Sequence, residues 1–441
     1  MSKNLPVSEH INSRLKPYSL YTLHSRAIPS MIDSLKPGQR KAIYTALKTA
    51  KSSFIKTASL GGYSLAMANF HHGNESMNDA IIGMAETFSN NAPLLEGSGS
   101  FGTRLVQEAS SPRYTSVRLH KNFTKIFLDH EILPEREDPE DPEPIYYLPV
   151  IPMVLVNGAS GIATGFATDI LPRDKETIIR ACEQYLNEGR VDTLVPSFPQ
   201  FDGRVYASQT PNQWVCEGKF SWKSKTQLEI TELPIGFDRE KYVKHLEKLS
   251  DNGLISSYDD NCSSDGFNFS VKLKQNSSNL SDEQVFTKFK LRRKLTENIT
   301  VIDENENLKI YDCAENLLKD FCDFRLSMYD KRYKYYIERD TEKRKYAIIK
   351  KEFIRMINDG EIDMKNSSRK EVKDFILKNP IAGFNVPEKF VERLLEIPVQ
   401  HLSKDYIAEL EKEVEKLEKN ITHWQKKNHQ EAFQEDLKSI A

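Results

Sequence analysis

The sequence predicts an α+β protein of several domains, with a helix-turn-helix region, a mixed middle region and a long antiparallel coiled-coil arm that carries a small helical tip. Three observations support this class. Two short helical patterns around a Gly-containing turn lie within residues 37–88, strand and helix patterns mix between about 175 and 310, and charged helical repeats fill the last 130 residues. A chain of 441 residues is long enough for roughly three domains.

Composition excludes several classes of protein. Hydrophobic residues make up 39% and charged residues 29% of the chain, which is typical of globular proteins. No apolar run approaches the ~20 residues that a membrane span needs, and the N-terminus does not resemble a signal peptide. The five cysteines are scattered, so we expect reduced structural thiols and no zinc site: Cys182, Cys216, Cys262, Cys313 and Cys322.

Charge is distributed unevenly along the chain. Residues 1–130 contain 15 Lys and Arg against 8 Asp and Glu, a net charge of +7. Residues 131–143 then contain seven acids, one arginine and three prolines. A basic region closed by an acidic loop indicates a polyanion-binding face, although a solvated loop beside a moderately basic domain would have the same composition.

Two helices are predicted in the basic region. The first begins at Pro37-Gly38 and carries Arg40 and Lys41 in its first turns, where the pair could meet phosphate or face solvent. The second follows His71-His72 and is capped by Asn74 or Ser76. Adjacent histidines on a turn point apart, so we expect a hydrogen-bonding or structural role for them and no metal site.

The segment Gly97-Ser98-Gly99-Ser100-Phe101-Gly102 has the spacing of a dinucleotide-binding motif. That motif requires a following helix and an acid ~20 residues later, whereas alternation follows here and no acid lies between Glu108 and Asp129. We therefore predict a tight turn with close backbone approach and reject the dinucleotide interpretation.

Arg113-Tyr114 is the candidate catalytic pair. A tyrosine hydroxyl can attack a phosphodiester and hold the broken strand as a phosphotyrosyl ester, which keeps the cut reversible. Arg113 could supply positive charge to the non-bridging oxygens of the phosphate. A tyrosine that packs on a strand beside a surface arginine would show the same two residues.

Residues 147–158 form an apolar run that predicts a buried strand. Ile162 follows on a turn between Gly161 and Gly165. An apolar residue at such a tip can wedge between base pairs, but a tight turn with Ile162 in the core fits this stretch as well.

The middle region is predicted to contain strands at 227–231 and 299–302, a helix at 240–249, and polar loops at 256–264 and 275–281. A long helix is then expected from about 314 to 358, with shorter helices between 367 and 395. Ser403 caps a last helix whose apolar residues follow heptad steps: Ile407, Leu410, Val414, Leu417, Ile421 and Trp424. This pattern predicts that the last helix pairs with the 314–358 helix of the same chain.

Several of these segments occur in the order and spacing of one family. The chain resembles the DNA breakage–reunion subunit of type IIA topoisomerases, most closely the medium subunits of T-even-type bacteriophages. The resemblance covers nearly the whole chain, and its matching segments include Arg26–Pro29, Leu35–Arg40, His71–Gly73, Phe101–Arg104, Arg113-Tyr114, Tyr147–Gly165 and Thr231–Pro234.

This resemblance implies a winged-helix DNA-cleavage domain (1–150), a mixed α/β tower (151–310), and a coiled-coil arm with a dimeric gate (311–441, tip about 359–402). It further implies that Tyr114 is the nucleophile, that Arg113 steadies the scissile phosphate and that Ile162 intercalates. Three basic residues and one histidine are implied to bind DNA around the same phosphate: Arg26, Lys36, Arg40 and His72.

The resemblance also implies an ATP-dependent reaction in which a homodimer makes a transient double-strand break and passes a second duplex through it. The sequence shows no ATPase motif and no Glu plus Asp-x-Asp metal centre, so Mg²⁺ and ATP are expected on a large ATPase/Toprim partner subunit. We expect relaxation or decatenation, no membrane partner, and a cytoplasmic location, that of the host cell if a phage encodes the chain. Ala80, at a position where bacterial relatives carry an acid, makes quinolone-type contacts doubtful.

Two other functions remain open at the level of sequence. One is a non-enzymatic, dimeric DNA-binding protein in which the coiled coil is architectural and Tyr114 is structural. The other is a nucleotide-dependent dehydrogenase, which would depend on the glycine motif rejected above. DNA attached covalently to Tyr114 would distinguish the cleavage subunit from the architectural protein.

Overall fold

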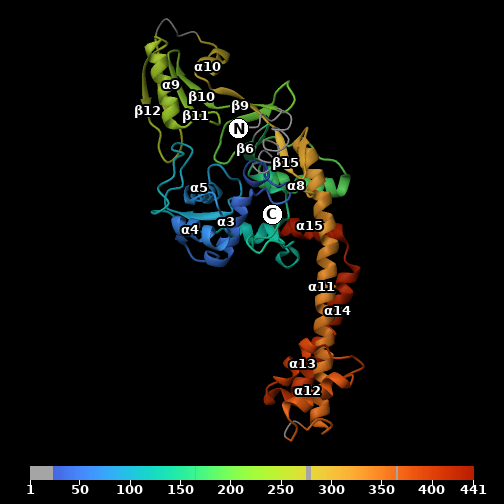
Figure 1. The fold of residues 1–441 in the computed structure, drawn as a ribbon. Helices are drawn as coiled ribbons and strands as arrows, with labels where there is room; N and C mark the ends of the chain where they lie inside the picture. Colours follow the sequence, from blue (N-terminus) through green and yellow to red (C-terminus); the bar gives the residue numbers. More distant parts are fainter. Residues whose placement is uncertain (1–22, 164, 275–279, 364–365) are drawn as a thin grey trace, which may run out of the picture. The chain divides into compact units, whose positions relative to one another are not determined.

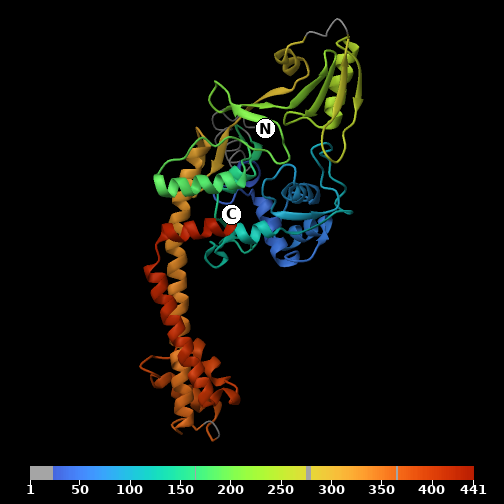
Figure 2. The ribbon, with the colours of Figure 1, turned by 180° about the vertical axis from the view of Figure 1, so that it is seen from behind.

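The computed structural model describes residues 23–163, 165–274, 280–363 and 366–441. The chain divides into two compact units, one reaching to Arg325 and including Gln434–Ala441, and one comprising Leu326–Phe433. The first contains helices and small antiparallel sheets and the second is helical, which confirms the α+β class (Figures 1 and 2). The domain boundaries predicted at 150 and 310 stay a prediction, because neither of them coincides with this division of the chain.

The first part of the chain is a cluster of helices beside a three-stranded sheet. It contains η2 (Leu23–Ala27), α3 (Pro37–Thr49), α4 (Thr57–Met67) and α5 (Asn74–Ala85). The antiparallel sheet has the order β1 (Ile55–Lys56), β3 (Ser116–Leu119), β2 (Leu95–Ser98). The two predicted helices correspond to α3 and α5, with α4 between them. We call the antiparallel pair of β2 and β3 the wing.

Two details of the predicted helices are wrong. We did not predict α4, whose Gly61-Gly62 pair gives it a weak helical pattern. Gly61 is required there because an added Cβ would lie 2.3 Å from Oδ1 of Asn78 on α5. Neither Asn74 nor Ser76 caps α5, because the N-cap is Gly73 at φ 86° and no side chain caps the helix.

The run from 147 to 158 is buried as predicted, but it is not one strand. Only Leu148-Pro149 forms a strand, β5, which pairs with β4 (Phe127–Leu128). Pro152 then begins the short helix α7 (Met153–Val156), since a proline supplies no amide to a sheet but suits a helix start. Around this run lie α6 (Lys121–Ile126), η3 (His130–Ile132), α8 (Lys175–Glu188) and the hairpin β6 (Ala159–Ala163)–β7 (Phe166–Ile170).

The middle region contains two further sheets. One has the order β14 (Arg292–Thr296), β9 (Gln213–Glu217), β8 (Arg204–Ala207). The other, which we call the tower sheet, has the order β10 (Lys219–Ser224), β11 (Gln227–Glu232), β13 (Phe269–Leu273), β12 (Ile255–Asp260). One face of the tower sheet packs against α9 (Arg239–Asp251) and α10 (Asp282–Lys288). The buried side chains of this core include Leu228, Ile230, Phe269 and Val271 from the sheet, Tyr242 from α9 and Val285 from α10.

The predicted strand at 227–231, the helix at 240–249 and the strand at 299–302 are confirmed by β11, α9 and β15 (Ile299–Ile302). β15 pairs with β16 (Leu308–Tyr311). The loop predicted at 256–264 is wrong over its first half, because β12 is an edge strand whose polar, exposed residues give little strand signal. Most of the loop predicted at 275–281 lies outside the described residues.

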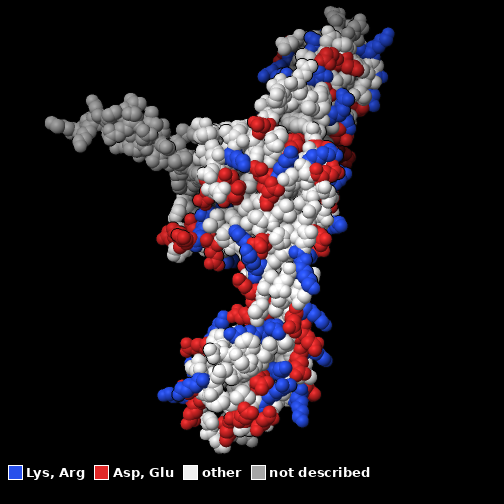
Figure 3. All heavy atoms as spheres, turned by 90° about the vertical axis from the view of Figure 1, so that its right-hand side faces the viewer, with Lys and Arg blue, Asp and Glu red and all other residues white. Residues whose placement is uncertain are grey.

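The helical arm matches its prediction closely. α11 spans Ala314–Asn358, and α12 (Arg369–Lys378), α13 (Glu388–Leu395) and η5 (Val399–Leu402) form the predicted tip. Ser403 caps α14 (Lys404–Lys426), accepting a hydrogen bond from the amide of Tyr406. Over the tip, Lys and Arg side chains are intermixed with Asp and Glu on the face shown in Figure 3.

α14 runs antiparallel to α11, and the two helices lie side by side in Figures 1 and 2. Leu410 packs with Ala347 and Ile354. Arg355 pairs with Glu411 at 3.0 Å, and Arg344 pairs with Glu418, also at 3.0 Å. The predicted pairing within one chain is therefore confirmed.

A last helix, α15 (His429–Ile440), was not predicted. Its end belongs with the first unit. Arg325, which is buried, lies 2.8 Å from Asp129 and 3.6 Å from Asp436 on α15. The carbonyl of Ile440 also accepts a hydrogen bond from Lys175. These contacts hold the chain terminus against residues that lie far earlier in the sequence.

Candidate nucleic-acid cleavage site

Arg113 and Tyr114 lie on an exposed turn just before β3. The amide of Tyr114 donates to the carbonyl of Ser111 at 2.9 Å, which closes the turn. The Tyr114 side chain is 71% exposed, and the Arg113 guanidinium carbon lies 5.8 Å from the centre of its ring. Among the described residues, the Arg113 side chain otherwise donates only to the hydroxyl of Ser111, at 3.3 Å. The alternative of a tyrosine packed on a strand is wrong, because this phenol projects into solvent.

The start of α4 holds both sides of this turn. The amide of Ala58 donates to the carbonyl of Pro112, and the amide of Thr57 donates to the carbonyl of Thr115. The buried hydroxyls of Thr57 and Thr115 also bond to each other at 2.8 Å. The first amides of a helix have no acceptor within the helix, and here the carbonyls of the turn supply that acceptor. The Arg113-Tyr114 turn is therefore held through backbone atoms, while both of its side chains are exposed.

The glycines before the turn allow close backbone approach, as predicted. Gly99 and Gly102 have φ of 107° and 87°, which favour glycine. An added Cβ at Gly97 would lie 2.5 Å from the ring of Phe101. The next helix after Gly102 begins only at Lys121, so the rejection of a dinucleotide site is confirmed.

Arg26 and His72 form a second part of the site. An Arg26 guanidinium nitrogen lies 2.5 Å from Nδ1 of His72, although the two residues are 46 positions apart. Partial burial, and then the positive charges of Arg26 and His71, lower the pKa of His72 below its ordinary value. The lowered pKa favours the neutral imidazole, whose Nδ1 can accept from Arg26, and the Arg26 side chain is exposed.

Lys36 links this group to the β6–β7 hairpin. Its ammonium donates to the carbonyl of Ser160 at 2.7 Å. Burial lowers the pKa of Lys36. A Cβ added at Gly161 would lie 2.0 Å from the carbonyl oxygen of Ala27 on η2, so only glycine fits there. The hairpin is held against η2 and the start of α3.

Ile162 follows directly on this hairpin, opposite Ala167 in the β6–β7 register. It is 87% exposed, the most exposed of the large hydrophobic side chains that the structure describes. The alternative in which Ile162 lies in the core is therefore wrong. Phe166 on the same hairpin is also exposed, so an apolar tip stands beside the basic residues.

Arg40 and Lys41 do not face the outside. Arg40 forms two hydrogen bonds with Asp33, at 2.8 and 3.0 Å, and both side chains are buried. Burial on its own would lower the pKa of Arg40, but the charge of Asp33 raises it. Direct contact between Arg40 and phosphate does not fit this geometry, because its guanidinium is committed to a buried carboxylate. Arg40 instead shapes the turn that leads into α3.

Lys41 is the cation that fastens the acidic segment 131–143. Its ammonium lies 2.6 Å from Asp141 and 3.0 Å from Glu143, and it also donates to the carbonyl of Ala68. Glu143 is buried and lies 3.5 Å from Arg136. The acidic segment is thus attached to the basic region through Lys41.

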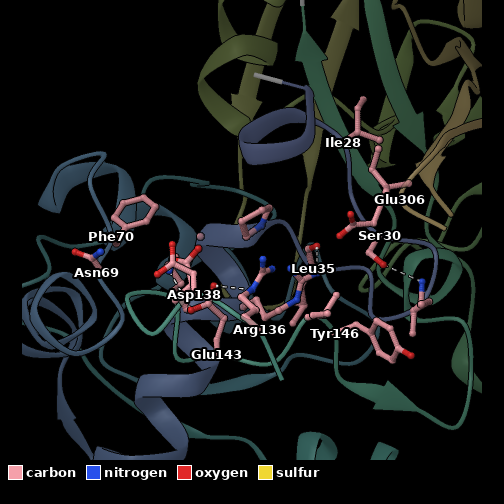
Figure 4. Close-up of a pocket in the computed structure, with 18 of the residues that line it drawn as sticks. Ile28, Ser30, Leu35, Asn69, Phe70, Arg136, Asp138, Glu143, Tyr146 and Glu306 are labelled. Carbon is pink, nitrogen blue, oxygen red and sulfur yellow. Dashed lines mark hydrogen bonds and ion pairs between the residues drawn. The ribbon is translucent and has the colours of Figure 1, made fainter. Parts of the chain in front are cut away.

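These residues line a cavity of about 480 Å³ beside His71 and His72 (Figure 4). Arg136 points toward Glu143 in this view, with Asp138 beside them. Although acids are numerous here, the described residues contain no group of three or more His, Cys, Asp or Glu side chains placed to hold a metal ion. The described residues therefore offer no set of side chains that could hold the Mg²⁺ of the predicted reaction.

The structure therefore brings some predicted site residues together and leaves others apart. Arg26 meets His72, and Lys36 meets the hairpin of Ile162. Within the described residues, Arg113 and Tyr114 form no hydrogen bond or ion pair with any of these four. Sequence analysis missed Asp33, Thr57 and Thr115, because a lone acid and two threonines give no motif.

The described cysteines form no disulfide with one another. No helix among the described residues is long and apolar enough to cross a membrane.

Comparison with known proteins identifies the family. Residues 26–439 match the model of the family that comprises the A subunits of DNA gyrase and topoisomerase IV. The DNA topoisomerase medium subunit of Enterobacteria phage T4 is 36% identical over 447 residues, with 99% of each chain covered. The mitochondrial DNA topoisomerase 2 of Dictyostelium discoideum is 32% identical, with 99% of this chain but only 34% of that protein covered.

A solved structure agrees with these matches. The crystal structure of the DNA-binding, cleavage and re-ligation domain of Plasmodium falciparum topoisomerase II superposes with a TM-score of 0.87 at 30% identity. The match covers 98% of this chain and 63% of that one. The chain thus spans about a third of the Dictyostelium protein but nearly the full length of the phage subunit.

Proposed function

The chain belongs to the family of the DNA gyrase and topoisomerase IV A subunits and is part of a type II DNA topoisomerase, and from this premise we propose that Tyr114 is its nucleophile. The observation that carries the proposal is the Arg113-Tyr114 turn, held through its backbone with both side chains exposed. The non-enzymatic architectural alternative is disfavoured, because the relatives are named as topoisomerases along the whole length of this chain.

In the proposed reaction, the Tyr114 oxygen attacks a backbone phosphorus and forms a 5′-phosphotyrosyl ester. The bond between phosphorus and the 3′ oxygen breaks, and the proton lost by the phenol ends on that 3′ hydroxyl. The reverse attack by the 3′ hydroxyl reseals the strand, because the ester retains the energy of the broken bond. Two copies acting on opposite strands make a double-strand break, through which a second duplex passes.

Arg113 is proposed to stabilise the charge that develops on the phosphate. Its only polar contact among the described residues is the weak one to Ser111, so its guanidinium can take up two phosphate oxygens. Preorganised donors of this kind typically contribute ~2–4 kcal/mol to the transition state. Arg113 needs no rearrangement of an ion pair before it can act.

Arg26, Lys36 and His72 are proposed to bind the DNA backbone near the cut. Ile162 is proposed to enter the base stack and kink the duplex, since an exposed apolar tip beside cations is the usual arrangement for such a wedge. Arg40 supports this surface from within through Asp33.

The remaining components of the reaction are proposed to come from partners. A large ATPase/Toprim subunit would supply the carboxylates that hold Mg²⁺ and the site that binds ATP. A second copy of this chain would join through the tip around residues 359–402. The complex would relax or decatenate DNA in the cytoplasm, that of the host cell if a phage encodes the chain.

The test is to mix this chain with a candidate partner subunit, Mg²⁺ and a DNA duplex, denature the mixture, and map any covalently attached DNA. We expect one phosphotyrosyl peptide that contains Tyr114, and none with Tyr114→Phe, whose DNA affinity should stay within about twofold because many phosphate contacts carry binding. Tyr63→Phe, another exposed tyrosine, is the matched control and should cleave normally. Covalent DNA on the Tyr114→Phe variant would place the nucleophile elsewhere.

Two further results would count against this assignment of partners. One is Mg²⁺-dependent relaxation of a plasmid by the purified chain alone. The other is a dimer that remains intact by sedimentation after residues 359–402 are deleted, since the proposed dimer contact lies within that tip.

A further inference from the structure

The loop that carries Tyr114 has a second anchor, far from the tyrosine. Residues 99–115 join β2 to β3, and Tyr114 lies near the end of this loop. The start of α4 holds that end. The middle of the loop, at Arg104 and Leu105, is fixed instead to the tower sheet.

Arg104 is buried and bound on three sides. Its guanidinium lies 2.9 Å from the carboxylate of Glu232, at the end of β11, and donates to the carbonyl of Leu233 at 3.0 Å. The rings of Phe201 and Phe267 flank it at 5.7 and 5.4 Å. Glu232 is buried too and also accepts from the amides of Asp202 and Leu233. A planar guanidinium suits this site, whereas an ammonium could not fill it in the same way.

Leu105 strengthens the same anchor. Its side chain packs against the core of the tower sheet, and its carbonyl accepts from the amide of Arg239, the first residue of α9. Gly102 makes the approach possible, since an added Cβ there would lie 2.7 Å from the carbonyl oxygen of Gln107. Residues 104 and 105 of the loop therefore pack as members of the tower sheet's core.

The two limbs of the loop are connected. The amide of Ser110 donates to the carbonyl of Ser100 at 3.0 Å. Thr103 and Val106 bond to each other through backbone and hydroxyl groups, which makes the intervening turn compact. Because hydrogen bonds stiffen the short segment between Arg104 and Tyr114, a displacement of Arg104 would also move the Arg113-Tyr114 turn.

We propose that Arg104 is a positioning residue that sets the place of the Arg113-Tyr114 turn by fixing its loop to the tower at Glu232 and Leu233. This inference rests on the proposed role of Tyr114. Arg104 is buried, so it acts on the chemical step and not on DNA affinity. Cleavage then depends on the tower sheet holding its place relative to the wing.

The first test needs no catalysis. Amide hydrogen exchange is measured on the full chain, comparing wild type with Arg104→Met and Arg104→Lys. We expect the amides of Thr57, Ala58 and Ser110, which bond within or to the loop, to exchange at least about tenfold faster in Arg104→Met. Amides in the middle of α3 should not change. Unchanged exchange at those three amides would overturn the inference.

The second test uses the complex with its partner subunit. We expect Arg104→Met to bind the duplex within about twofold of wild type but to form the covalent complex roughly ten- to a hundredfold more slowly, so that kcat falls while KM holds. Glu232→Gln should produce a similar loss, and the double variant should lose little more, because both act through one contact. Wild-type rates in Arg104→Met, or a loss confined to DNA affinity, would contradict the proposal.

Arg239→Met is the matched control, because its side chain pairs with Asp260 inside the tower while only its backbone amide meets the loop. It should cleave at the wild-type rate. If Arg104→Met fails to fold, Arg104→Lys takes its place, with a smaller effect of the same kind. Failure of wild type to form covalent DNA would refute the role of Tyr114, whereas the exchange result would still decide whether Arg104 holds the loop.

Discussion

Two basic segments of the same helix-turn-helix and wing region have opposite fates in the structure. Arg40-Lys41 and Arg113-Tyr114 look alike in sequence, each a cation on a turn or helix start near a DNA-binding pattern. Arg40 and Lys41 are buried against Asp33, Asp141 and Glu143, whereas Arg113 and Tyr114 are exposed. A cation beside a buried acid serves the fold, whereas an exposed cation without an acid partner among the described residues is available to a ligand.

The largest expected effect tests the buried side of this comparison. Arg40→Met should lower the free energy of unfolding by about 3–5 kcal/mol, because it leaves the carboxylate of Asp33 buried without its cation. Urea unfolding at pH 7 measures this change. The double variant Asp33→Asn with Arg40→Met should recover much of the loss, since no uncompensated charge remains. A single variant as stable as wild type would show that water reaches Asp33.

Arg113→Ala tests the exposed side. It should slow cleavage by about 2–4 kcal/mol of transition-state stabilisation while leaving the urea midpoint unchanged, because Arg113 has no buried partner among the described residues. Single-turnover formation of covalent DNA, with the partner subunit present, measures the rate. Arg113→Lys keeps the charge without the planar fork and should recover only part of it. A destabilised Arg113→Ala protein would end the contrast with Arg40.

Ile162→Ala should reduce DNA bending and cleavage several-fold more than it reduces binding, because a wedge offsets the cost of unstacking only in the bent complex. Fluorescence transfer between dyes at the duplex ends reports the bend. Ile310→Ala, at an exposed isoleucine outside this hairpin, is the control and should bend DNA normally. An unchanged bend angle in Ile162→Ala would mean that this exposed side chain is not inserted.

The smallest effect concerns His72. The pKa of His72 in the folded chain lies below the unfolded value of about 6.5, so the unfolded chain takes up the proton first as the pH falls. His72 therefore lowers the stability of the fold below that pH and has no effect on it above. Arg26→Met should raise the pKa of His72 by removing a neighbouring charge, although burial, the larger cause, remains. Imidazole chemical shifts measure this, with His120 as a control that Arg26 does not perturb. A fall in the pKa would contradict the contact.

Local patterns were enough to predict much of this molecule. Pro37-Gly38 fixed the start of α3, Ser403 the start of α14, and the heptad steps from Ile407 the seam that packs on α11, because helix starts and stripes depend on residues a few positions apart. The order and spacing of the segments from Arg26–Pro29 to Thr231–Pro234 were likewise sufficient to identify the family, which the comparisons confirm.

Tertiary structure alone decided which cations are free. Arg40 pairs with an acid seven positions away and Lys41 with acids about a hundred positions away, and no local pattern encodes such contacts. The same holds for Arg104 and Glu232, which lie 128 positions apart. Burial depends on what the rest of the chain places beside a residue. The sequence by itself therefore determined most of the long helices, the family and the candidate tyrosine, whereas folding determined which cations stay exposed.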